Sequence, residues 1–145
     1  MILTLPWPPS VNRYWRHPTT GKLAGRHLIS EEGRRYRATV KEACWDVPMV
    51  PGRIGVAILA SPPDARRRDL DNLFKSVLDS LVHAAVIEDD SLIDALSIVR
   101  GDRRVGGQIQ ILIEPMSAAE ITDYLGRTTQ DAVDADGGTP VEVRG

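Results

Sequence analysis

The sequence of 145 residues contains one cysteine, Cys44, and no long apolar segment. A single cysteine cannot form a disulfide within the chain or supply a multi-cysteine zinc site, which favours a reducing compartment. No stretch has the length and hydrophobicity needed to cross a bilayer, and the N-terminus lacks the basic segment that begins a signal peptide. These absences predict a cytoplasmic protein.

Several catalytic motifs are missing as well. The chain has no GxxxxGKS/T or GxGxxG loop for nucleotide phosphates, and it has no nucleophile elbow. Its three histidines, His17, His27 and His83, lack the HExxH spacing of zinc peptidases. The loop that starts at Asp69 cannot be an EF-hand, because Phe74 stands where the turn glycine is required. The sequence therefore argues against all of these chemistries.

Composition and charge predict a folded body with an acidic extension. Hydrophobic residues make up 42% of the chain and charged residues 26%, which is typical of one globular domain. Residues 1–75 hold 13 lysines and arginines against 7 aspartates and glutamates, so this part of the chain could face a polyanion. Residues 116–145 hold 2 against 6 and few large apolar groups. We expect one domain at residues 1–115 and a largely disordered extension at residues 116–145.

Hydrophobic periodicity predicts four strands and two helices in the body. The expected strands are residues 1–5, 53–60, 92–99 and 107–113. A hairpin is the simplest connection between the last two. One helix should begin after Ser30 and run to about Trp45, and the other should cover about residues 71–86. This order favours an α+β two-layer sandwich in which both helices pack on one face of a small mixed β-sheet.

Residues 6–27 are expected to form an extended loop, because three prolines keep its start out of any sheet. The loop mixes cations with flat rings, namely Arg13, Arg16, Trp7, Tyr14 and Trp15. Such a mixture suits contact with nucleic acid. Alternatively, the rings pack beneath the loop and belong to the core.

The first helix has an apolar side and a basic side. Tyr36, Val40 and Cys44 fall together at helical spacing, so this side should pack against the core. The basic side carries Arg34, Arg37 and Lys41. We consider its two arginines candidates for DNA binding, although an exposed helix face is often charged for solvation alone.

The segment ARRRDLDNLFK, residues 65–75, concentrates opposed charges. Its three arginines are Arg66, Arg67 and Arg68, and such a group can hold a DNA backbone. Asp69 and Asp71 can bind a metal ion that polarises a phosphate and activates water. Lys75 can stabilise charge in the transition state. On a simpler interpretation, the aspartates only cap the helix and Lys75 only pairs with Asp71 four residues earlier.

A second acidic cluster, Glu88-Asp89-Asp90, follows the far end of the same helix. Hard cations such as Mg²⁺ bind through carboxylates, while water and substrate phosphate fill the remaining positions. Two acidic clusters and a lysine therefore favour a metal site over helix capping. The sequence leaves open which of the three acids is the ligand.

Three segments resemble the RusA family of Holliday junction resolvases, over about residues 1–115. They are LPWPPSVNRYWRH near the start, RRRDLDNLFKSVLDSL in the middle and EDD after the helix. The resemblance implies a RusA-like fold in which Asp69, Asp71 and Asp90 are metal-binding catalytic carboxylates and Lys75 is essential. It also implies a homodimer that uses Mg²⁺ or Mn²⁺ to nick two symmetry-related strands of a four-way DNA junction.

The length of the second helix bears on how the site is assembled. If this helix runs from Asp71 to about Val86, it is about 22 Å long, since each residue adds about 1.5 Å. The four residues from there to Asp90 span at most about 13 Å, too short to return to Asp69 and Asp71. Either the helix breaks early, near Ser80, or Asp90 completes the site of the partner subunit, and we predict the latter.

The favoured interpretation is a dimeric, metal-dependent endodeoxyribonuclease that resolves four-way junctions in recombination and repair. Two alternatives remain. In one, the chain is a non-catalytic nucleic-acid-binding module whose arginines hold phosphates and whose aspartates cap a helix. In the other, it is a generic nuclease that acts on branched DNA without preference for junctions.

Overall fold

The computed structural model describes residues 1–116 and residue 119. Within this part, the chain forms a four-stranded sheet, a two-stranded ladder, three α-helices and one 3-10 turn. The elements follow in the order β1 (Ile2–Pro6), α1 (Val11–Tyr14), β2 (Trp15–Arg16), β3 (Leu28–Ile29), α2 (Glu31–Ala43), β4 (Ile54–Ser61), α3 (Asp71–His83), η1 (Asp90–Leu92), β5 (Ile93–Arg100) and β6 (Gln108–Pro115).

No helix in the described part of the chain combines the length and the hydrophobicity that a membrane crossing requires. The predicted acidic extension, residues 116–145, lies outside the described residues except for Met116 and Ala119.

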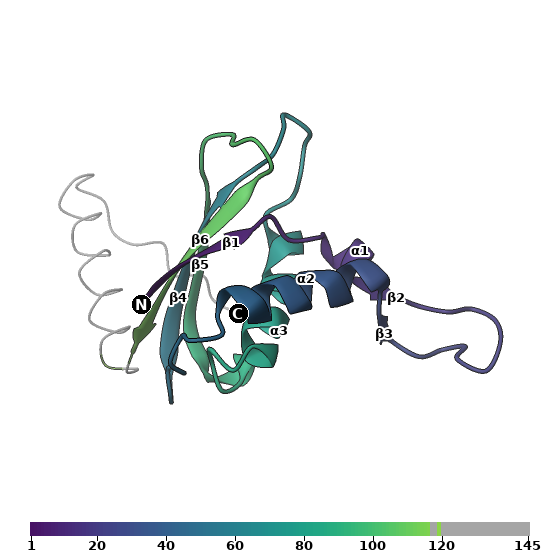
Figure 1. Cartoon of the computed structure of the whole chain (residues 1–145), viewed down its shortest axis with the longest axis horizontal. Helices are drawn as coiled ribbons and strands as arrows, with labels where there is room; N and C mark the ends of the chain where they lie inside the picture. Colours follow the sequence, from purple (N-terminus) through teal and green to yellow (C-terminus); the bar gives the residue numbers. More distant parts are fainter. Residues whose placement is uncertain (117–118, 120–145) are drawn as a thin grey trace, which may run out of the picture.

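The strands of the main sheet lie in the order β1-β6-β4-β5 (Figure 1). β4 and β5 are parallel, whereas β1 with β6 and β6 with β4 are antiparallel. The expected hairpin of the last two strands is therefore wrong, because β4 lies between them. The physical reason for this order is the crossover through α3. It carries the chain from the end of β4 across one face of the sheet, so that β5 runs parallel to β4. The predicted α+β architecture with a small mixed sheet is confirmed.

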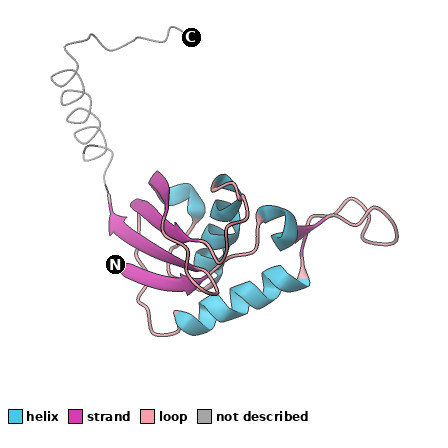
Figure 2. Cartoon of the chain, turned by 90° about the horizontal axis from the view of Figure 1, so that it is seen from above, coloured by secondary structure: helices cyan, strands magenta, loops and turns pink. Residues whose placement is uncertain are grey.

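Both long helices, α2 and α3, lie on the same face of the sheet (Figure 2). On α3, the buried residues Leu73, Val77 and Leu81 recur at helical spacing, and they share one core cluster with Val56 and Ile58 of β4. The predicted apolar side of α2 is also buried, with Tyr36, Val40 and Cys44. No helix of residues 1–116 covers the opposite face of the sheet, and its exposed residues include Ile2, Leu59 and Val99.

The start of α2 follows its sequence signal. The Ser30 hydroxyl accepts a hydrogen bond of 3.0 Å from the Gly33 amide, and acidic residues occupy the first turn, where the helix dipole favours them. The helix ends at Ala43, slightly before the predicted end at Trp45.

The segment expected as an extended loop, residues 6–27, contains more regular structure than predicted. It holds α1 and β2, and β2 pairs with β3. Tyr14 is fully buried, and its hydroxyl accepts a hydrogen bond of 2.5 Å from Arg37 Nε. For this ring, the packing interpretation is therefore correct. The chain between β2 and β3 projects from the body (Figure 1).

The end of α3 lies at His83, before the predicted end near Val86. Ala85 adopts a left-handed conformation with φ 57. The Val86 amide donates to the Leu81 carbonyl at 3.0 Å, and the Ala85 amide donates to the Val82 carbonyl at 3.0 Å. These two bonds form a Schellman motif with alanine where glycine is usual. The chain therefore reverses and returns along α3 instead of continuing away from it.

Replacing Ala85 with glycine should stabilise the protein. A left-handed conformation costs a residue with a Cβ about 1–2 kcal/mol, while glycine loses about 0.5–1 kcal/mol of chain entropy on folding. We expect Ala85→Gly to raise the free energy of unfolding, measured in urea, by about 0.5–1 kcal/mol. Ala84→Gly is the control, because Ala84 has φ −82, and it should lower that free energy by a similar amount. Two changes of the same sign would contradict this account of the turn.

Candidate active site

Two aspartates flank the start of α3 without capping it. The N-cap residue is Leu70, which has helical φ and ψ and no side-chain cap hydrogen bond. Asp69 and Asp71 are exposed, and neither forms a side-chain hydrogen bond or salt bridge with any described residue. The capping interpretation is therefore wrong for this pair. Both carboxylates can accept a ligand, and Asp71 lies in the first turn, beside the positive end of the helix dipole.

Lys75, one turn further along α3, lies between two other carboxylates. Its Nζ is 2.9 Å from Asp79 Oδ1 and 2.9 Å from Asp90 Oδ2. The simple pairing with Asp71 is not formed. Hydrogen bonds from Lys75 to Asp79 first, and then to Asp90, raise the pKa of the Lys75 ammonium above its usual value. The raised pKa favours the positively charged form of Lys75 at neutral pH.

Asp79 is the residue of this site that sequence reasoning missed. Its side chain is only 14% exposed, and its Oδ2 is buried without a hydrogen-bond partner in the described structure. A carboxylate in such a place needs a nearby cation, which Lys75 supplies. The available signal was the spacing of four residues from Lys75 to Asp79. On a surface helix this spacing is commonly no more than a weak ion pair.

Asp90 pairs with Lys75 of its own chain, which a helix running to Val86 did not predict, whereas no described contact joins Asp90 to Asp69 or Asp71. The helix is shorter than assumed, and the reversal at Ala85 brings the acidic cluster back beside the middle of α3. The helix ends at His83 and does not break near Ser80. The Lys75–Asp90 pair favours a site built within one chain, and completion of the site by the partner subunit stays an untested prediction.

The three acids of the second cluster have different surroundings. The Glu88 carboxylate accepts a hydrogen bond of 3.1 Å from the Gly52 amide. Asp89 caps η1 by accepting from the Ser91 amide at 2.8 Å. Hydrogen bonding to the side chain of Ser91 first, and then to its amide, lowers the pKa of the Asp89 carboxyl. Asp90 alone of the three hydrogen-bonds to Lys75. The geometry therefore favours Asp90 as the acid of this cluster that joins the site.

The described structure does not bring the three predicted metal ligands, Asp69, Asp71 and Asp90, into one cluster. Among residues 1–116 and 119, no group of three or more His, Cys, Asp or Glu side chains is close enough to hold a metal ion. Asp69 instead lines a cavity of about 700 Å³ that also contains the three arginines before it. The donor set nevertheless fits Mg²⁺, because this ion typically binds through one or two carboxylates and completes its shell with water and phosphate oxygens.

The arginines before Asp69 have unequal roles. Arg68 binds Asp64 with both guanidinium nitrogens, at 2.7 and 2.9 Å, and lies 5.8 Å from the Trp7 ring centre. This pairing holds the pKa of the Asp64 carboxyl well below its usual range. Arg68 thus shapes the loop, whereas Arg66 and Arg67 are exposed.

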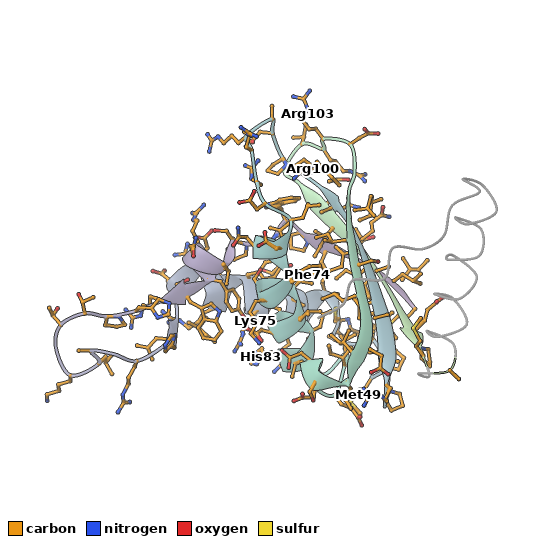
Figure 3. All side chains as sticks on the ribbon, turned by 180° about the vertical axis from the view of Figure 1, so that it is seen from behind. Met49, Phe74, Lys75, His83, Arg100 and Arg103 are labelled. Carbon is orange, nitrogen blue, oxygen red and sulfur yellow. The ribbon has the colours of Figure 1, made fainter. Side chains whose placement is uncertain are left out.

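Loops carry further cations near the N-terminal end of α3. Arg100 donates to the Arg68 carbonyl at 2.6 Å and ties β5 to the arginine segment. Figure 3 shows Arg100 and Arg103 beyond this end of the helix, while Lys75 and His83 follow one another along it. The predicted DNA-binding residue Arg13 pairs with Glu32 at 2.9 Å, so its charge is partly neutralised.

Comparison with known proteins gives consistent matches. The family model described as Endodeoxyribonuclease RusA matches residues 6–114. A crossover junction endodeoxyribonuclease of Enterobacteria phage HK97 is 37% identical over 117 residues, which is 79% of this chain and 93% of that protein. Proteins of the same name from Shigella sonnei (strain Ss046) and Escherichia coli (strain K12) are 39% and 38% identical over 118 residues, with the same coverage. The family match includes both acidic clusters and ends before the acidic extension.

Removing the Asp79 charge should lower the pKa of Lys75. Asp79 makes the larger contribution to the raised pKa, so Asp79→Asn should shift the titration of the Lys75 ammonium to lower pH. The titration can be followed by NMR with labelled lysine. Asp46→Asn, which changes an exposed acid after α2, is the control and should leave Lys75 unchanged. An unaltered Lys75 titration in Asp79→Asn would rule out this role for Asp79.

Proposed function

The chain belongs to the RusA family of endodeoxyribonucleases, and from this we propose that it resolves Holliday (four-way) DNA junctions by metal-dependent phosphodiester hydrolysis, in recombination and repair. One observation carries the assignment of the active site: Lys75 and Asp90, far apart in sequence, are 2.9 Å apart beside the helix that begins with Asp71. The non-catalytic alternative needs Asp69 and Asp71 to cap α3, and no side-chain cap hydrogen bond is formed there.

We assign the metal to the carboxylates of Asp69, Asp71 and Asp90. Mg²⁺, or Mn²⁺ in its place, would polarise the scissile phosphate when bound and lower the pKa of the attacking water. The exposed position of Asp69 and Asp71 leaves room for a phosphate between them and the solvent. Phosphate oxygens would complete the coordination, which explains why the carboxylates alone do not form a closed cluster.

Lys75 contributes a positive charge that is already in position. Its ammonium is held by two carboxylates, so it loses little freedom when negative charge develops on the phosphate. The exposed Arg66 and Arg67 would attract the DNA backbone before chemistry begins. The positive end of α3 adds to the same field.

Paired nicks on symmetry-related strands require two sites, so we propose that a homodimer acts on the junction. Each subunit would bring its own Lys75 and Asp90, because these residues meet within one chain. The two sites would then be related by the two-fold axis of the dimer.

Asp71→Asn should abolish nicking but retain binding. Loss of a metal ligand removes several kcal/mol of transition-state stabilisation, so nicking of a synthetic four-way junction should fall by at least about a hundredfold. Binding, measured at fixed salt, should stay within about threefold, since it depends chiefly on cations. Asp46→Asn is the matched control and should nick normally. Nicking that persists with a chelator, or in Asp71→Asn, would refute the metal mechanism.

Junction preference separates a resolvase from a generic branched-DNA nuclease. At one salt concentration, unlabelled junction should compete for binding far better than linear duplex or a flap of equal length. Equal competition by the flap would favour the generic nuclease.

Mixed subunits should not regain activity. If Asp71→Asn and Asp90→Asn chains are combined, every site in the heterodimer should carry one damaged residue, because we propose that Asp71 joins the site of the Lys75–Asp90 pair of its own chain. Nicking should therefore stay at the level of the single variants. A mixture of wild type with Asp71→Asn provides the control for subunit exchange, since it should yield dimers that nick one strand. Recovered nicking in the doubly damaged mixture would show that subunits share sites.

A further inference from the structure

A second hollow lies outside the cluster around Lys75. It has a volume of about 860 Å³ and is bordered by the β2–β3 ladder, by α2 and by the end of α3. Its polar and aromatic lining consists of Trp15, Arg16, His27, Arg34, Arg37, Lys41 and His83. Aliphatic residues form the rest of the lining, and no aspartate or glutamate contributes to it. The hollow therefore presents concentrated positive charge over a partly apolar floor.

The cations of this hollow are not neutralised by carboxylates. In the described part of the chain, Arg16, Arg34, Arg37 and Lys41 form no salt bridge, whereas several other arginines do. Neutral groups hold two of them in place. Arg34 Nη1 donates to the Ile29 carbonyl at 2.8 Å. These contacts fix the guanidinium groups while leaving their charge available to an anion.

Arg37 is held in a similar way. Its Nε donates to the Tyr14 hydroxyl, and its guanidinium carbon lies 5.6 Å from the centre of the Tyr14 ring. Because Tyr14 is fully buried, this anchor is rigid. The hollow is thus pre-organised for a ligand that carries negative charge.

The hollow lies at a defined distance from the proposed cleavage site. Lys75, Asp79 and His83 succeed one another at intervals of four residues along α3, so His83 lies about 12 Å from Lys75 along the helix. Figure 3 shows both residues on this helix. A DNA strand carries one phosphate per about 3.4 Å of helix axis, so this distance corresponds to a few phosphates.

We propose that this hollow binds the backbone of the cleaved DNA strand, two to four nucleotides from the scissile phosphate. The proposal rests on the proposed function, which supplies the DNA strand. It adds a second anchoring point whose cations come from α2 and β2 rather than from the arginine segment before Asp69. A strand held at both points is fixed in register with Lys75, which places one chosen phosphate at the site of chemistry.

The test uses the full-length protein and junctions with single neutral methylphosphonates placed one to six nucleotides from the cut on either side. Binding is measured without divalent metal, so that no cleavage occurs. Wild-type protein should lose affinity when the neutral linkage lies two to four nucleotides from the cut on one side. The double variant Arg16→Gln/Lys41→Gln should bind the unmodified junction about tenfold more weakly, with a salt dependence reduced by about two phosphate contacts.

The decisive measurement combines the double variant of the protein with the neutral linkage in the DNA. At the contacted position, the double variant should lose no further affinity on the neutral junction, because the partner cations are already absent. Lys22→Gln/Arg26→Gln is the matched control, because it removes the same charge at two positions of the projecting loop that do not line the hollow, next to Leu23 and His27, which do. It should remain sensitive to the same linkage. Thermal unfolding of both variants verifies that they are folded.

Three results would overturn the subsite. The first is that Arg16→Gln/Lys41→Gln binds the unmodified junction as tightly as the wild type does. The second is that Lys22→Gln/Arg26→Gln weakens binding by the same factor. The third is that Arg16→Gln/Lys41→Gln loses as much affinity as the wild type when the same linkage is made neutral. A failure of the proposed function is recognised separately, since the wild-type protein would then not nick the junction in Mg²⁺. A protein that nicks normally but shows one of these results would retain its function and lose only the subsite.

Discussion

The ion pairs of Lys75 with Asp79 and Asp90 are the interaction on which the arrangement of the site depends. They join the middle of α3 to the segment that follows its end, so Asp79 and Asp90 share the ammonium group of Lys75, which lies 15 positions before Asp90. Asp79 is largely buried and would otherwise be a charge without a counterion. The opposed charges of this region therefore serve structure, since one lysine neutralises both acids, and under the proposed function the same lysine also serves the chemistry.

The sequence predicted the core better than the connections. Periodicity identified which sides of α2 and α3 are buried, because burial depends on spacing within one element. Strand neighbours depend on long-range pairing, so the hairpin expected at the end of the domain was replaced by the order β6-β4-β5. The helix end was misjudged for a local reason. It is made by Ala85 in a conformation that glycine normally signals, and Ala84-Ala85 gives no such signal.

Clustering in the sequence identified most acidic residues of the candidate site. It did not predict which of them contact Lys75. Asp69, Asp71 and Asp90 stand out in the sequence, whereas Asp79 resembles an ordinary helix surface residue. The arginines show the same limit. Counting charge treats Arg68 and Arg67 alike, yet Arg68 is committed to Asp64 and Trp7 while Arg67 is exposed. The contacts of each arginine in the folded chain, and not the number of arginines in the sequence, decide which of them are available to bind DNA.

The Schellman turn after α3 also constrains which insertions and deletions this protein can tolerate in evolution. Between His83 and Asp90, the chain has only six residues in which to turn, bury two side chains and deliver a carboxylate to Lys75. Insertion or deletion of one residue here would displace that carboxylate by about 3 Å, the length of one extended residue. This stretch should therefore keep a constant length among descendants of the chain, whereas the projecting segment between β2 and β3 is free to lengthen or shorten.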